Sequence, residues 1–167
     1  MIFATVGTQL PFDRMINVLD NWSLKQKVNK CFAQIGEQGA HPKSIDFSPN
    51  LTPLQFAKHI ANCKVILSHA GMGTILTALQ HKKPIIVMPR LAKYGEHRND
   101  HQLATVANLE HRAGIHVARG EDELLTLLER VAVLRSGSDV SSAAGPDLLS
   151  AISTFILSDK AKGLRYA

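Results

Sequence analysis

The stretch Val65-Ile66-Leu67-Ser68-His69-Ala70-Gly71-Met72-Gly73-Thr74-Ile75-Leu76-Thr77 decides the fold class of this 167-residue chain. Its first four residues form a short run that is typical of a buried parallel strand, and Ile75, Leu76 and Leu79 predict a helix packed on that strand. A strand, a turn with two glycines and a helix N-terminus leave backbone N–H groups unpaired at the positive end of the helix dipole. Such a corner binds anions, most often phosphate, although the glycines could equally serve only to permit a tight turn.

The glycine turn, residues 71–74, differs from the two common phosphate-binding loops. No lysine follows it, so it is not a Walker A loop. Leu76 stands where a G-x-G-x-x-G motif has its third glycine. The turn therefore disfavours binding of NAD.

The composition is that of one globular domain. Hydrophobic residues make up 45% and charged residues 20%, which disfavours disorder and a coiled coil. The chain is too short for two nucleotide-binding halves, so a site in a cleft between two domains would need a second chain. The formal charge of +5 suits nucleic acid, an anionic membrane surface or a phosphorylated ligand. The basic residues form no run and do not alternate with aromatic residues, so we expect no nucleic-acid partner.

Cysteine usage and hydropathy predict a protein of the cytoplasm. Cys31 and Cys63 lie far apart without C-x-x-C spacing, which indicates free thiols in a reducing compartment. Residues 1–7 lack a basic segment and a small-residue cleavage site. No apolar run reaches the roughly 18 residues that a membrane-spanning helix needs. We therefore expect a cytoplasmic chain that is not itself integral to a membrane.

Predicted strands and helices alternate along the chain. The strands are residues 2–6, 32–36, 45–47, 65–68, 84–88 and 115–118, and the helices begin at Pro11, at a Thr52-Pro53-Leu54-Gln55 capping box, at the glycine turn, at a second capping box over 99–102 and at Glu121. This alternation predicts an α/β fold, a Rossmann-like parallel sheet with helices on both faces. Ligands of such sheets bind beyond the carboxyl ends of the strands, so segments 7–9, 69–74 and 89–102 can meet in one crevice.

One domain accounts for the organisation of the chain. We predict that residues 1–134 form it and that residues 135–146, rich in serine and glycine, are a linker. The C-terminal segment 147–167 belongs to the same domain and contains a helix from Asp147 to Leu157.

Polar side chains near the predicted crevice have more than one interpretation. His69 can contact a ligand or hydrogen-bond a neighbouring backbone group at its strand end. His97 and His101 are four residues apart, as metal ligands on one helical face would be, but no third ligand accompanies them at fixed spacing. Asn99 is expected to cap the helix, and Gln102 can complete the cap or donate to ribose or sugar hydroxyls.

Four motifs follow one another along residues 1 to 120. They are Thr5-Val6-Gly7-Thr8 with Phe12-Asp13, Ser68-His69-Ala70-Gly71-Met72-Gly73-Thr74, Lys83-Pro84-Ile85-Ile86-Val87-Met88-Pro89 and Asn99-Asp100-His101-Gln102. Together they resemble the C-terminal, donor-binding half of family-28 glycosyltransferases. The motifs also look like those of donor subunits of transferases split into two chains, namely the dolichol-linked N-acetylglucosaminyltransferase and bacterial exopolysaccharide transferases. The resemblance implies one half of a GT-B architecture.

The resemblance also implies a site for a UDP-sugar. In the family the glycine turn holds the diphosphate, and a later His-Gln pair reaches the donor sugar. The implied substrate-binding residues are Gly7, Thr8, His69, Gly71, Met72, Gly73, Thr74, His101 and Gln102. Many relatives hold the ribose hydroxyls with a glutamate where this chain has Thr77, so its ribose contact is weaker or made by another group.

The implied reaction is inverting transfer of a hexose from a UDP-sugar to a lipid-linked acceptor in polysaccharide or glycan synthesis. Backbone N–H groups at a helix N-terminus stabilise the leaving diphosphate without a cation, so we expect no metal and no cofactor besides the UDP-sugar substrate. The general base is expected on a membrane-associated, acceptor-binding second subunit, and the basic surplus suits an anionic cytoplasmic membrane face. No catalytic residue is assigned in this chain. A non-catalytic UDP-sugar sensor and a half resembling a nucleotide-sugar epimerase remain alternatives.

Overall fold

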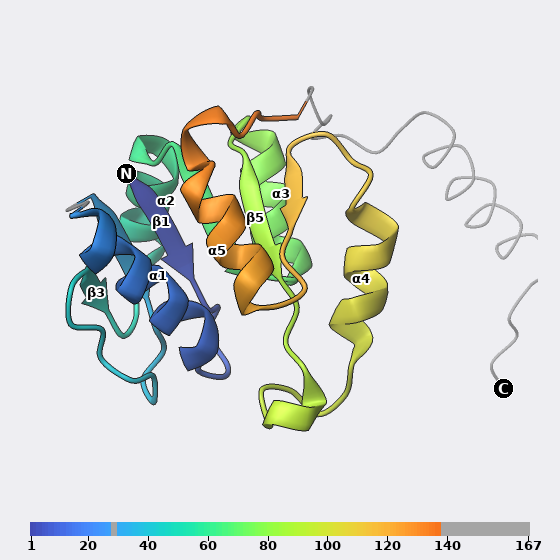
Figure 1. The fold of residues 1–167 in the computed structure, drawn as a ribbon, viewed down its shortest axis with the longest axis horizontal. Coiled ribbons are helices and arrows are strands. Elements are labelled where there is room, and N and C mark those ends of the chain that lie inside the picture. Colours follow the sequence, from blue (N-terminus) through green and yellow to red (C-terminus); the bar gives the residue numbers. More distant parts are fainter. Residues whose placement is uncertain (28–29, 138–167) are drawn as a thin grey trace, which may run out of the picture.

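A computed structural model of the protein describes residues 1–27 and 30–137, and a parallel sheet runs through its centre (Figure 1). Its strands are β1 (Ile2–Thr5), β2 (Cys31–Gln34), β3 (Asp46–Ser48), β4 (Val65–His69), β5 (Ile85–Met88) and β6 (Ile115–Val117). The six strands lie in the order β3-β2-β1-β4-β5-β6, and every neighbouring pair is parallel. The predicted Rossmann-like parallel sheet is confirmed.

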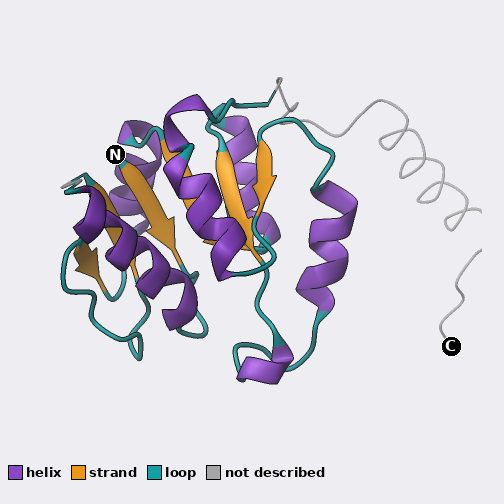
Figure 2. Cartoon of the chain, viewed as in Figure 1, coloured by secondary structure: helices purple, strands orange, loops and turns teal. Residues whose placement is uncertain are grey.

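Helices cover both faces of the sheet (Figure 2). Helices α1 (Asp13–Gln26) and α5 (Glu121–Glu129) pack on one face, and α2 (Pro53–Asn62), α3 (Met72–Gln80) and α4 (His101–Leu109) lie on the other. Side chains alternate between the faces along each strand, so Ile2 and Ala4 join the core beneath α1 and α5, whereas Phe3 joins the opposite core. Two short 3-10 helices complete the described elements, η1 (Ala92–Tyr94) and η2 (Val131–Val133).

The strand order reverses between β1 and β4. Strand β1 pairs with β2 on one side and with β4 on the other, and Thr5 lies opposite Ser68 at the carboxyl ends. Connections leave these two strands towards opposite faces of the sheet, which opens a crevice beyond their ends. The fold therefore places the loop after β1 beside the glycine turn after β4.

Local signals predict the start of α2 correctly. Thr52 Oγ1 accepts a hydrogen bond from the Gln55 backbone N–H at 3.3 Å, and the Thr52 N–H donates to Gln55 Oε1 at 2.9 Å. Pro53 occupies the first helical position. Because all partners lie within four residues, the sequence pattern alone specifies this capping box.

Other predicted boundaries and contacts differ in the structure. Helix α1 begins at Asp13 rather than Pro11, because the Pro11 carbonyl accepts a hydrogen bond from Arg90 and holds this residue in the preceding loop. Leu76 is 41% exposed, so the strand packing of α3 comes from its buried neighbours Ile75 and Leu79. The second capping box is wrong, because the N-cap residue Asp100 makes no side-chain cap.

Two further predictions concern cysteines and membrane spans. Cys31 and Cys63 are free, as predicted. Both are also buried, and burial raises the pKa of both thiols. No helix within residues 1–27 and 30–137 has both the length and the apolar character needed to cross a bilayer. The predicted linker beyond residue 137 and the helix from Asp147 to Leu157 lie outside the described residues.

Candidate functional site

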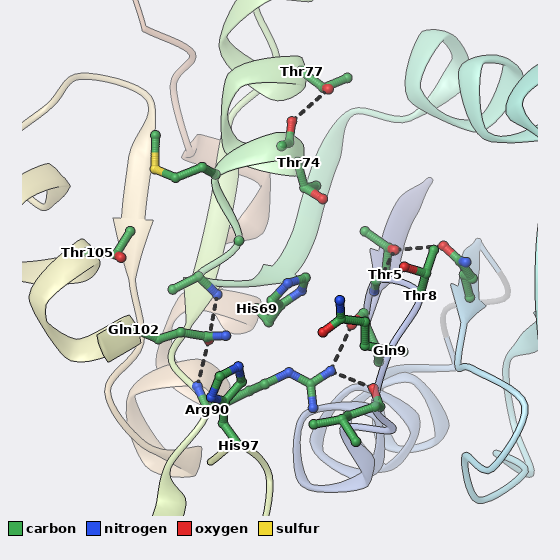
Figure 3. Close-up of a pocket in the computed structure, with 18 of the residues that line it drawn as sticks. Thr5, Thr8, Gln9, His69, Thr74, Thr77, Arg90, His97, Gln102 and Thr105 are labelled. Atoms are coloured by element: carbon green, nitrogen blue, oxygen red, sulfur yellow. Dashed lines mark hydrogen bonds between the residues drawn. The ribbon is translucent and has the colours of Figure 1, made fainter. Parts of the chain in front are cut away.

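A pocket of about 730 Å³ opens beyond the carboxyl ends of β1 and β4 (Figure 3). Segments 7–9, 69–74 and 89–102 all contribute to its lining, so their predicted convergence is confirmed. The lining includes every predicted substrate-binding residue: Gly7, Thr8, His69, Gly71, Met72, Gly73, Thr74, His101 and Gln102. Their contact with a ligand remains a prediction.

The glycine turn presents backbone donors to this pocket. Gly71 is the N-cap of α3, so Met72, Gly73 and Thr74 form its first turn, and their N–H groups have no carbonyl partner within the helix. A Cβ atom added to Gly73 would meet no atom within 4 Å. Open space therefore lies against the backbone at the positive end of the helix dipole, which is the environment that phosphate prefers.

The imidazole of His69 explains two of the glycines. A Cβ atom on Gly71 would lie 2.3 Å from His69 Nε2, and one on Gly7 would lie 2.8 Å from His69 Cε1. Gly7 also has a φ of +79°, which favours glycine. Gly71 has a φ of −89°, so the close approach of the ring, and not a tight turn, requires glycine there.

His69 is a neutral imidazole at pH 7. Burial is the main cause that lowers its pKa from 6.5 to about 4, and the positive charge of Arg90 lowers it further. A hydrogen bond with the Thr5 backbone opposes this shift. The backbone interpretation of His69 is thus confirmed, and its contact with a ligand remains a prediction.

Gln102 links two walls of the pocket instead of capping α4. Its side chain is 3% exposed, and Oε1 accepts hydrogen bonds from the backbone N–H groups of Ala70 at 3.2 Å and Arg90 at 3.0 Å. Figure 3 shows its amide nitrogen directed towards His69. Only the amide nitrogen of Gln102 is left to contact a ligand, as a donor, because Oε1 already accepts two hydrogen bonds within the protein.

His97 and His101 lie beside each other in the pocket lining. Their rings meet edge to face in a T-shaped contact with centroids 4.5 Å apart, and His101 Nδ1 pairs with Asn99 Oδ1. The Asn99 oxygen also accepts a hydrogen bond from the His101 N–H at 3.3 Å, a local contact at the start of α4. Within the described residues, no three His, Cys, Asp or Glu side chains gather as ligands for a metal ion.

Thr77 lines the pocket one turn into α3. Its hydroxyl donates to the Gly73 carbonyl at 2.8 Å. The side chain is thus bonded to its own helix, as threonine often is at a helical position. A ribose contact from Thr77 would compete with this bond.

Sequence patterns did not identify three buried polar residues of the pocket. Thr5 Oγ1 donates to Gln34 Oε1 at 2.8 Å and accepts a hydrogen bond from the Gly7 N–H at 3.2 Å. Arg90 lies on the opposite side and is 3% exposed. A polar residue that follows a strand in a charged loop resembles a solvent-facing one, so no local signal marked Arg90.

Comparison with known proteins gives matches to glycosyltransferases. Residues 1–138 match the glycosyltransferase family 28 C-terminal domain. A UDP-N-acetylglucosamine--N-acetylmuramyl-(pentapeptide) pyrophosphoryl-undecaprenol N-acetylglucosamine transferase of Prochlorococcus marinus (strain MIT 9215) is 31% identical over 96 residues, which cover 53% of this chain and 25% of that protein. The transferase of the same name from strain MIT 9312 is 33% identical over 72 residues, which cover 41% of this chain and 19% of that protein. The matched region is therefore no more than a quarter of these relatives.

Solved structures share the fold. MurG of Acinetobacter baumannii has a TM-score of 0.55 at 19% identity, over 78% of this chain and 40% of that chain. The solution structure of ALG13 also has a TM-score of 0.55, at 17% identity, over 84% of this chain and 89% of that chain. The fold is thus the Rossmann-like one of a GT-B glycosyltransferase half, and, because the family match spans most of its length, the chain belongs to glycosyltransferase family 28 through that family's C-terminal domain.

Proposed function

We propose that this chain is the UDP-sugar-binding subunit of an inverting glycosyltransferase that transfers a hexose to a lipid-linked acceptor. The observation that carries the proposal is the open space against Gly73 at the N-terminus of α3, in the pocket beyond the carboxyl ends of β1 and β4. A diphosphate placed there faces the free N–H groups of Met72, Gly73 and Thr74. Family membership and the names of the curated relatives support a UDP-sugar as the ligand.

The proposed chemistry places the departing charge at the glycine turn. When the glycosidic bond to UDP breaks, negative charge develops on the diphosphate, and preorganised N–H donors at a helix N-terminus stabilise it. The helix dipole acts in the same direction. We propose that these groups serve in place of a divalent cation, so that the reaction needs no metal and no further cofactor.

The catalytic base and the acceptor site are assigned to a second subunit. No Asp or Glu from the described part of the chain lines the pocket, so a carboxylate base for the acceptor hydroxyl would come from elsewhere. The curated relatives are at least four times longer than the region that they share with this chain, and ALG13 has a similar extent to this chain. We propose a membrane-associated partner that holds this chain at the cytoplasmic face of a membrane.

UDP is expected to stabilise the isolated chain against heat in the presence of EDTA. At a UDP concentration of 100 times Kd the free energy of unfolding rises by about 2.7 kcal/mol, because UDP binds the folded state alone. Differential scanning fluorimetry with UDP, with and without added Mg²⁺, measures this gain. Absence of a shift would remove the donor-site assignment, and a shift that requires Mg²⁺ would contradict metal independence.

Sugar transfer is expected only when the chain is combined with its partner subunit. The measurement is transfer of a radiolabelled hexose from a UDP-sugar to membrane lipid, with the chain alone, the partner alone and the two together. Transfer by the chain alone would refute the two-subunit proposal. A complex that binds the UDP-sugar without transferring or epimerising it would establish a sensor, and epimerised UDP-sugar would establish an epimerase.

A further inference from the structure

Arg90 connects the loop that follows β1 to the loop that follows β5, and both loops line the pocket. Its Nη2 donates to the carbonyls of Val6 at 2.8 Å and Leu10 at 2.6 Å. Its Nη1 donates to the carbonyls of Pro11 at 2.5 Å and Glu96 at 3.2 Å. Each terminal nitrogen thus serves two carbonyls, and the guanidinium ties the loop after β1 to the loop after β5.

Within residues 1–27 and 30–137, the Arg90 guanidinium forms no ion pair with an Asp or Glu side chain, although the nearby charge of Glu96 raises its pKa and so opposes part of the lowering that burial causes. The carboxylate of Glu96 instead binds Arg14, with Oε1 2.7 Å from Nε and Oε2 2.8 Å from Nη2. Burying a charge without an ion-pair partner costs free energy, because the charge loses its hydrating water. The dipoles of the four carbonyl groups replace that water around the Arg90 guanidinium.

This charge acts on the pocket itself. Arg90 is one of the lining residues, and its charge contributes to the lowered pKa of His69, which ends the neighbouring strand β4. Arginine stays protonated in proteins even when burial lowers its pKa, as it does here. The pocket therefore carries a fixed cation that is held in place by backbone contacts.

We infer that Arg90 is a positioning residue that makes this pocket selective for a nucleoside diphosphate over the uncharged nucleoside. It does so through its fixed charge and through the two loops that it holds together. Both terminal nitrogens are already occupied by carbonyls, so Arg90 acts on the diphosphate through its electrostatic field. The inference rests on the proposed function, because it assigns the charge preference of the same donor pocket.

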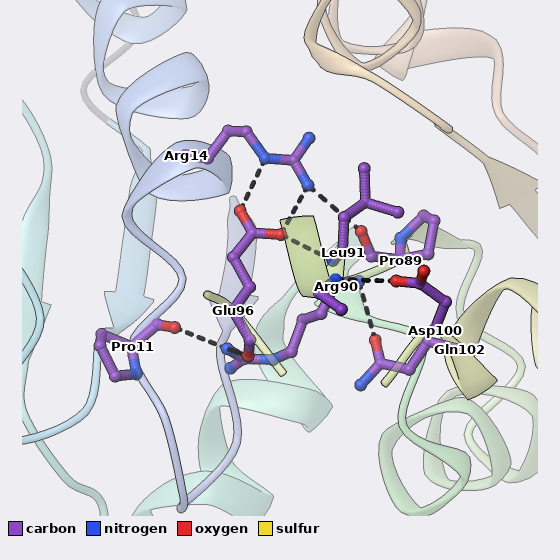
Figure 4. Close-up of polar contacts among 9 residues, drawn as sticks. Pro11, Arg14, Pro89, Arg90, Leu91, Glu96, Asp100 and Gln102 are labelled. Carbon is purple, nitrogen blue, oxygen red and sulfur yellow. Dashed lines mark hydrogen bonds and ion pairs between the residues drawn. The ribbon is translucent and has the colours of Figure 1, made fainter. Parts of the chain in front are cut away.

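A neighbouring ion pair offers a control with no net charge. The Arg14–Glu96 pair holds the same loop through the Leu91 N–H, which donates to Glu96 Oε2 at 2.9 Å (Figure 4). The Arg14 guanidinium also lies over the Tyr94 ring, 4.9 Å from its centroid. The double variant Arg14→Gln/Glu96→Gln loosens the loop and leaves the charge of the pocket region unchanged.

The test compares UDP and uridine affinities by isothermal titration calorimetry in EDTA at low salt. Arg90→Gln is expected to lower the ratio of UDP to uridine affinity by about tenfold or more, since a unit charge near an anion is worth that much at a partly buried site. Arg90→Lys keeps the charge and is expected to keep the ratio within about threefold, even though it loses carbonyl contacts. The Arg14→Gln/Glu96→Gln variant is expected to keep the ratio as well.

Each outcome decides the inference. An unchanged ratio in Arg90→Gln, or an equal loss in Arg90→Gln and Arg90→Lys, would overturn the charge role while leaving the proposed function intact. A wild-type chain that binds no UDP would overturn both. If Arg90→Gln does not fold, ¹⁵N NMR of the Arg90 guanidinium in the wild-type chain replaces it. UDP should then shift these resonances and uridine should not, and an equal response to both would overturn the inference.

Discussion

Gly73→Phe is expected to abolish UDP binding while the chain stays folded. The residue occupies the second position of α3, and a Cβ atom there meets nothing within 4 Å, so a larger side chain leaves the backbone towards the space proposed for the diphosphate. We expect UDP affinity to fall by more than about a hundredfold, equivalent to about 3 kcal/mol of binding free energy. Calorimetric titration with UDP measures the loss of affinity. Circular dichroism and thermal unfolding of the unliganded variant show whether the chain stays folded.

Two further variants distinguish the effect of a large side chain at the proposed diphosphate site from its effect elsewhere on α3. Gly73→Ala is expected to raise the free energy of unfolding by up to about 1 kcal/mol, because alanine favours a helix over glycine, and still to weaken UDP binding. Gln80→Phe places the same aromatic group at the exposed C-terminal end of α3, outside the pocket lining, and should leave UDP affinity unchanged. Wild-type affinity in Gly73→Phe would show that the diphosphate binds elsewhere.

Gly71→Ala is expected to destabilise the chain by about 1–3 kcal/mol, the usual cost of overpacking a well-packed site. The added methyl group would lie 2.3 Å from His69 Nε2, so the imidazole must leave its position between Gly7 and Gly71. In a His69→Ala background the obstacle is gone, and the same substitution should cost less than about 0.5 kcal/mol. Urea unfolding of the wild type, both single variants and the double variant completes the cycle.

Gly120→Ala is the matched control for this cycle. Gly120 is also the N-cap of a helix, α5, and a Cβ atom on it would meet nothing within 4 Å. The change in free energy of unfolding caused by Gly120→Ala therefore reflects the replacement of the N-cap residue alone, without a steric clash. Equal costs for Gly71→Ala and Gly120→Ala, or no coupling between Gly71 and His69, would show that the ring does not require glycine at position 71.

The predicted and observed starts of helices show how far local sequence patterns reach. The capping box at Thr52 is correct because its donors and acceptors all belong to one turn of chain. The box predicted at 99–102 is wrong because Gln102 Oε1 binds the N–H of Ala70, 32 residues away, together with that of Arg90. A side chain with competing partners distant in sequence is beyond the reach of a capping pattern.

Sequence patterns predict the α/β class, the strand–glycine turn–helix unit and the segments that meet at the pocket. Hydrophobic periodicity, turn residues and the rule that ligands bind beyond the carboxyl ends of parallel strands are sufficient for these conclusions. All of them depend on residues close together in the chain or on sheet topology.

Long-range packing explains the glycines at positions 7 and 71, the free amide nitrogen of Gln102 and the contacts of Arg90. Arg90 donates to carbonyls 79 to 84 residues earlier in the chain. The His69 ring likewise fills a space bordered by two strand ends that the parallel pairing of β1 and β4 brings together. Burial and hydrogen-bond partners of a polar side chain arise from such long-range packing, and no local pattern encodes them.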